Sequence, residues 1–124
     1  MPEPSHPNQA QPIDFREVLD RIGGDSAFLK ELLIIYFQEY EKKKNLLAQA
    51  LAEQNFTQLS ELGHSLKGSS ANLSLPRLRK TAYLLEMAGK QKMLQSAQEA
   101  VRAFEAEVET LKAFLAQNQP NERP

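Results

Sequence analysis

The chain has 124 residues and a net charge of −1, with 15 Lys and Arg residues against 16 Asp and Glu residues. This length suits one domain with a modest core, and the near-neutral charge argues against a general nucleic-acid binder. The sequence contains no cysteine, which excludes disulfides, thiolate metal sites and cysteine nucleophiles. It also has no apolar run near the roughly 18 residues of a membrane span and no signal-peptide pattern, so we expect a soluble, cytoplasmic protein without membrane contacts.

The N-terminal part predicts a tail and two helices. Residues 1–12 are polar and rich in proline, and we expect a flexible tail. A short helix is predicted over 13–22, with Asp14 able to cap it, followed by a stop at Gly23-Gly24. Asp25 is a predicted N-cap for a long helix that runs to about Gln54. Its first half is apolar over so wide an arc that we expect the short helix to pack across it.

The C-terminal part predicts three more helices. Asn55 is a predicted cap for a helix over 56–73, and Ser74 is a predicted cap for the next one, which has Pro76 in its first turn and ends at Gly89. The last helix starts at residue 93 or 94, and its apolar residues recur at steps of three and four, as in antiparallel bundles. A self-associating coiled coil is the competing interpretation of that helix.

These elements predict an all-α fold. No segment shows the alternation of a strand, and the helical stripes match within one chain. We therefore expect a monomeric, antiparallel up-down-up-down four-helix bundle over residues 13–117, with the additional short N-terminal helix packed on it. Residues 118–124 form a second polar tail. The initial methionine and the polar ends favour a free-standing protein.

One histidine stands out in the third predicted helix. On a helical wheel His64 lies opposite a leucine stripe that falls at roughly 160–220° from it. Its own side carries one cation and small residues, all within about 60° on the same wheel: Ser60, Lys67, Gly68 and Ala71. The surrounding segment 64–92 holds six Lys and Arg residues against the single Glu86. Such a basic patch favours an acidic or phosphorylated partner, although a merely solvated face explains it too.

Several enzyme classes lack the residues they need. The sequence has no nucleophile elbow for a serine hydrolase and no glycine loop between a strand and a helix for a nucleotide. A metal site needs several converging ligands, but Glu61 and His64 give the Glu-x-x-His spacing only once, and the other histidine, His6, lies in the N-terminal tail. We therefore predict no metal site and no bound cofactor.

The residues around His64 fit a nucleophile that waits for an electrophile on a partner. A neutral imidazole can attack phosphorus, and the Lys67 ammonium one turn away can offset charge on a transferring phosphoryl group. Gly68 costs about 0.5–1 kcal/mol in a helix interior relative to Ala. Close approach of another protein explains this residue better than helix packing, because Gly68 lies on the His64 side.

The stretch HSLKGSSANL resembles the histidine-containing phosphotransfer (HPt) family of two-component phosphorelays, whose motif is His-x-Leu-Lys-Gly-Ser/Ala followed by small residues. The resemblance implies a helical bundle in which His64 carries the phosphoryl group and Lys67 and Gly68 are the matching lysine and glycine. It implies receiver domains of response regulators or hybrid histidine kinases as partners. It further implies no kinase domain, no ATP, and Mg²⁺ held by the receiver, so we expect a phosphocarrier without kinase activity of its own.

Two positions depart from the family pattern. Many members have Gly where this chain has Ser74, and we expect a changed turn because Ser74 can cap the next helix. Members often carry glutamine or another neutral polar residue near the phosphoryl site, at the position we match to Glu86. A carboxylate there would repel phosphate, so Glu86 either points away or is paired with a cation, and we do not count it as a site residue.

The leading hypothesis is a phosphorelay intermediate that takes a phosphoryl group from one receiver aspartate onto His64 and gives it to another. The receiver would approach Ser60, Gly68 and Ala71 around His64. We expect steering from Arg77 and Lys80 and apolar contacts from Phe15 and Ile22. The alternatives are an adaptor that docks on a receiver or kinase without carrying phosphate and, more distantly, a metal-dependent bundle enzyme.

Overall fold

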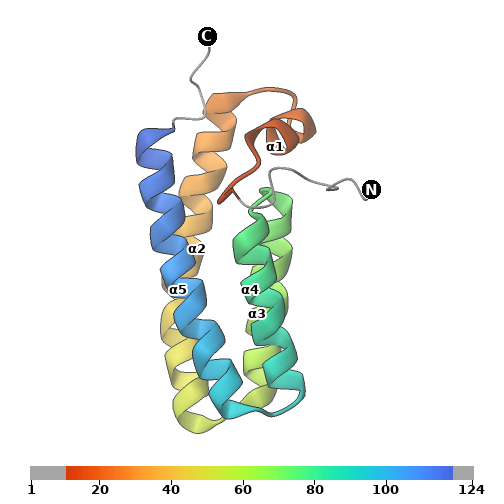
Figure 1. Cartoon of the computed structure of the whole chain (residues 1–124), viewed down its shortest axis with the longest axis vertical. Coiled ribbons are helices and arrows are strands. Elements are labelled where there is room, and N and C mark those ends of the chain that lie inside the picture. The colour runs from red at the N-terminus through yellow and green to blue at the C-terminus, as the bar shows by residue number, and fades with distance from the viewer. Residues whose placement is uncertain (1–10, 119–124) are drawn as a thin grey trace, which may run out of the picture.

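The computed structural model describes residues 11–118, which form five helices and no strand. The helices are α1 (Phe15–Arg21), α2 (Ser26–Glu53), α3 (Phe56–Asn72), α4 (Pro76–Lys90) and α5 (Leu94–Gln117). The four long helices run alternately up and down, each packed against the next, and α1 lies across one end (Figure 1). The predicted bundle with a short additional N-terminal helix is confirmed. The predicted tails lie almost wholly outside the described residues, in 1–10 and 119–124.

Side-chain caps begin the first three helices where the sequence predicted them. The carboxylates of Asp14 and Asp25 and the amide oxygen of Asn55 each accept a hydrogen bond from the backbone N–H three residues on, at 3.0, 2.9 and 3.0 Å. These bonds satisfy N–H groups that have no partner within the helix. Gly23 and Gly24 leave α1 with φ of 81° and 80°, values that glycine adopts without strain.

Two predicted helix boundaries are wrong. Ser74 does not cap α4. It adopts the left-handed conformation, with φ of 56°, and its Oγ accepts a hydrogen bond from Arg21 at 2.8 Å, while Leu75 takes the cap position. Ser74 therefore forms a left-handed turn after α3 and is not the cap that the sequence predicted. Gly89 does not end α4 either, because it is buried inside the helix, which continues to Lys90.

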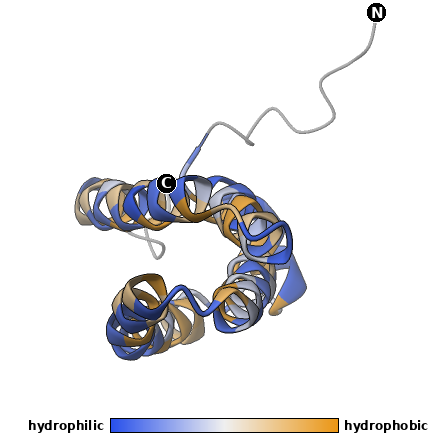
Figure 2. Ribbon diagram, turned by 90° about the horizontal axis from the view of Figure 1, so that it is seen from below, coloured by the Kyte–Doolittle hydropathy of each residue, from blue (hydrophilic) through white to orange (hydrophobic). Residues whose placement is uncertain are grey.

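The core lies between the four long helices and is built mainly from leucine and alanine. In α4 the buried stripe consists of Leu78, Ala82, Leu85 and Ala88, and in α5 Phe104, Val108 and Leu111 are inaccessible to water. In the view along the bundle, every helix carries hydrophobic as well as hydrophilic residues (Figure 2). Since the stripe of α5 packs inside its own chain, the bundle interpretation of this helix holds and the coiled-coil alternative does not.

Helix α1 covers less of α2 than the sequence predicted. Phe15 stacks on Phe114 of α5, with ring centroids 6.2 Å apart, so α1 closes the end of the bundle. On α2, Ile34 and Ile35 remain 56% and 51% exposed. The wide apolar arc of α2 is therefore only partly buried by α1 and the neighbouring helices.

Candidate functional site

His64 lies on the outer side of α3, and 71% of its side chain is exposed. The imidazole is oriented by one contact, because its Nδ1 lies 3.1 Å from Oε2 of Glu86 on α4. The exposed position agrees with the helical wheel. The carboxylate partner, by contrast, comes from a residue that the sequence analysis did not count in the site.

Glu86 is a buried carboxylate with three partners. Its side chain is only 6% exposed, yet Lys67 Nζ lies 2.8 Å from Oε1 and Lys90 Nζ lies 3.4 Å from Oε2. The hydrogen bond from Lys67 lowers the pKa of Glu86 most, and those from His64 and Lys90 add to it. Together they outweigh the opposing effect of burial and bring the pKa to about 2. Glu86 is therefore ionised at neutral pH. The sequence required that this carboxylate either point away from His64 or be paired with a cation, and the structure shows the pairing.

Two glycines bring α3 and α4 close enough to make this arrangement. A Cβ on Gly63 would lie 2.5 Å from the backbone nitrogen of Glu86, and a Cβ on Gly89 would lie 2.6 Å from the backbone nitrogen of Ser60. Both contacts are too short for any side chain, so only glycine fits at either position. The close approach of the two backbones places the Glu86 carboxylate beside the ring of His64.

The pairing determines which nitrogen of His64 offers a lone pair to the outside. An ionised carboxylate only accepts hydrogen bonds, so Nδ1 must carry a proton to donate to Oε2 of Glu86. In the neutral ring the lone pair then lies on Nε2. The arrangement supplies a nucleophilic nitrogen with an orienting carboxylate behind it, as in other side-chain pairs that activate a nucleophile.

The surface next to His64 is open, and its use as a docking face stays a prediction. A Cβ at Gly68 would meet no atom within 4 Å, so packing inside the bundle does not account for this glycine. Ser60 and Ala71 are partly exposed on the same helix. The end of α3 is held by Arg21, whose guanidinium donates to the carbonyls of Ala71 and Asn72 at 3.0 and 2.9 Å.

The other predicted partner-binding residues differ in how exposed they are and in what they contact. Lys80 is exposed and shares a cavity wall with Lys67. Arg77 is turned toward α5, where Nε lies 2.9 Å from Oε1 of Glu107. Phe15 and Ile22 are partly buried and pack against the core, Phe15 through its stacking on Phe114. A docking role for these four residues stays a prediction.

Glu86 and Lys90 were not predicted from the sequence as members of the site. Lys90 lies four residues after Glu86, a spacing that places both on one helix face. The sequence alone could therefore have predicted that these two residues pair. The position of Glu86 beside His64 depends on the register of α3 against α4. Gly63 and Gly89 fix that register, but their sequence separation alone does not reveal that they face each other.

Two further features concern metals and membranes. Across residues 11–118, no group of three or more His, Asp or Glu side chains is arranged to hold a metal ion. In the same range, no helix combines the length and the apolar character that crossing a bilayer requires.

Comparison with known proteins identifies one family. The model of the Hpt domain family matches residues 31–114, which include His64 and its partners Lys67, Glu86 and Lys90. Multistep phosphorelay regulator 1 of Schizosaccharomyces pombe is 39% identical to this chain over 62 residues. That segment makes up 50% of this chain but only 21% of the relative.

Proposed function

Because the chain belongs to the Hpt domain family, which has a phosphotransfer role in two-component signalling, we propose that it is a phosphorelay intermediate. His64 accepts a phosphoryl group from the aspartyl phosphate of one receiver domain and passes it to the aspartate of another. The pairing of His64 with Glu86 carries this proposal, because it leaves Nε2 as an exposed nucleophile. Residues 13–117 form the domain that does this.

The transfer needs no proton to move. The Nε2 lone pair of neutral His64 forms the bond to phosphorus, the bond between phosphorus and the aspartyl oxygen breaks, and the aspartate leaves as a carboxylate. The ring keeps the proton on Nδ1 and so becomes positively charged. The ionised Glu86, 3.1 Å away, stabilises that charge. In the second transfer the same steps run backwards toward the other aspartate.

Lys67 offsets the negative charge of the phosphoryl group while Lys90 keeps Glu86 paired. In the free protein Lys67 is bound to Oε1 of Glu86, and 29% of its side chain is exposed. Turning toward a phosphoryl group on Nε2 takes it away from the buried carboxylate. Lys90 remains on Oε2, so Glu86 keeps a cation nearby when Lys67 moves. A buried charge left without any partner would be strongly destabilising.

The receiver docks on the open side of α3. Gly68 leaves room beside His64 for the receiver's active-site loops, and Ser60 and Ala71 extend this small-residue surface. A larger side chain at Gly68 would keep His64 away from the aspartyl phosphate of the receiver. Because productive transfer requires the reacting atoms to lie about 3–3.5 Å apart, this clearance matters for the rate.

Transfer between two purified receivers tests the proposal. Radiolabelled phosphoryl groups on a first receiver should pass to the second only when this chain is present, with a labelled intermediate on the chain. His64→Gln should abolish the labelled intermediate, whereas His6→Gln, which replaces the other histidine, should not. Label on the His64→Gln variant would show that the assignment is wrong. Binding of the wild-type chain without labelling would support the adaptor alternative instead.

A further inference from the structure

A cationic cavity lies next to the phosphotransfer site. It has a volume of about 640 Å³ and is formed between the Lys67 side chain of α3 and the outer face of α4. We call it the basic groove, and its lining residues are Lys67, Pro76, Arg77, Arg79, Lys80 and Tyr83. Four of these six residues are cations and none is acidic, so the groove attracts negatively charged groups.

Two of the four cations have no carboxylate to balance them. Lys67 is paired with Glu86, and Arg77 is paired with Glu107. Arg79 and Lys80 are exposed, and across residues 11–118 neither forms an ion pair with an acidic side chain. Lys42 and Lys43 on α2, by contrast, are both paired with Glu39. The charge of the groove is therefore available to a partner.

The groove also offers an apolar surface. The Tyr83 ring is 47% exposed, and Lys67 Nζ lies 5.6 Å from its centroid. An aromatic side chain flanked by cations suits a segment that carries acidic groups beside apolar ones, because aromatic and arginine residues are those favoured at protein interfaces. A single phosphate ion would occupy only a small part of 640 Å³.

Lys67 links the groove to the phosphotransfer centre, since the same side chain lines the groove and bonds the carboxylate that holds His64. An acidic segment seated in the groove lies within reach of the docking face around His64. We propose that the basic groove binds an acidic segment of the receiver partner and that Arg79 and Lys80 determine how tightly each receiver docks. This inference rests on the proposed function of His64.

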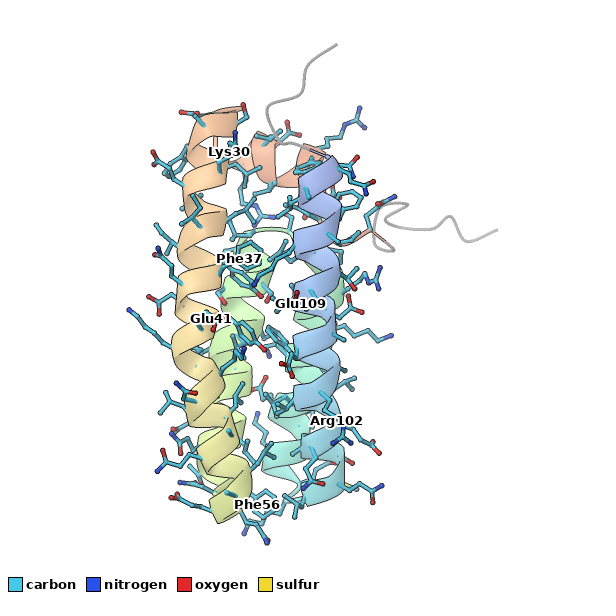
Figure 3. All side chains as sticks on the ribbon, turned by 90° about the vertical axis from the view of Figure 1, so that its left-hand side faces the viewer. Lys30, Phe37, Glu41, Phe56, Arg102 and Glu109 are labelled. Carbon is cyan, nitrogen blue, oxygen red and sulfur yellow. The ribbon has the colours of Figure 1, made fainter. Side chains whose placement is uncertain are left out.

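Charge reversal on the groove tests the inference. The double variant Arg79→Glu/Lys80→Glu is compared with Lys30→Glu/Arg102→Glu, which makes the same charge change at exposed positions on α2 and α5 (Figure 3). The readout is transfer of phosphoryl groups from a phosphorylated receiver, measured as kcat and KM at two salt concentrations. Phosphorylation of His64 by phosphoramidate, a small donor that needs no docking, is measured in parallel.

The groove variant should raise KM for the receiver by about tenfold, leave kcat within about twofold, and weaken the salt dependence of association. The control pair should change KM much less, and all variants should react with phosphoramidate at the wild-type rate. Equal effects of the two double variants, or a loss confined to kcat, would overturn the inference. The inference would also be overturned if a single-stranded RNA bound the groove more tightly than the receiver does. If the wild-type chain takes no phosphoryl group from any donor, the proposed function itself fails.

Discussion

Replacing Glu86 by Gln removes the buried carboxylate and keeps the size of the side chain, so it tests how strongly the carboxylate is held. The pKa of Glu86 falls from its ordinary 4.5 to about 2 in the folded protein. A carboxyl whose pKa is lowered by folding stabilises the protein above its unfolded pKa, and this contribution is lost as the pH falls toward the folded pKa. Between pH 7 and pH 3 the loss amounts to about 2 kcal/mol by linkage.

Water around the exposed partners His64 and Lys90 screens the interaction and reduces this figure to about 1 kcal/mol at the lower limit. Urea unfolding followed by circular dichroism at pH 7 and pH 3 gives the free energies of unfolding for both proteins. The stability of the wild type relative to Glu86→Gln should fall by about 1–2 kcal/mol over this interval. Glu61→Gln, an exposed change on α3, should show no such fall. A difference that stays within about 0.5 kcal/mol would contradict the arrangement around Glu86.

Four other substitutions probe the site and its support. Lys67→Ala should slow phosphotransfer on the order of 100-fold, because it removes a cation that lies beside the His64–Glu86 pair, while Lys90 still pairs with Glu86 and the fold is kept. Gly68→Ala should raise the free energy of unfolding by about 0.5–1 kcal/mol, since its Cβ meets no atom, and should slow transfer from a receiver. Gly63→Ala should lower stability by about 1–3 kcal/mol, because its Cβ would lie 2.5 Å from the backbone of Glu86. Arg21→Met should cost about 1 kcal/mol in urea unfolding, through lost bonds to the end of α3.

Each of these predictions has its own opposing result, and for Arg21→Met it is an unchanged free energy of unfolding. An unchanged transfer rate would remove Lys67 from the mechanism, and Lys67→Arg should recover part of the lost rate. Wild-type transfer by Gly68→Ala and by bulkier variants at this position would show that the receiver does not approach it. Equal stability changes for Gly63→Ala and Gly68→Ala would contradict the close packing of α3 on α4.

The fold was readable from the sequence because local signals agree with one another. Caps at Asp14, Asp25 and Asn55 and the leucine periodicity each depend on residues within a turn or two. Predictions failed where a distant residue decides the local conformation. Ser74 was predicted to cap α4, but Arg21, 53 positions earlier, bonds its Oγ and the turn is left-handed instead.

The site was readable in the part that lies on one helix. His64, Lys67 and Gly68 share a face of α3, so the wheel alone brings them together. Glu86 lies 22 residues from His64, and a helical wheel says nothing about how one helix meets another. Glu86 was not predicted as a site residue because a carboxylate repels a phosphoryl group. Only the structure shows that two lysines neutralise it and that its Oε2 lies 3.1 Å from Nδ1 of His64.

The most direct test of the account is to determine which atom carries the phosphoryl group. Nuclear magnetic resonance of the ¹⁵N-histidine-labelled protein reports the protonation of both ring nitrogens of His64, before and after phosphorylation by a receiver. We predict a proton on Nδ1 in both states and phosphorus bonded to Nε2 in the second. Phosphorus on Nδ1, or on any residue other than His64, would contradict it.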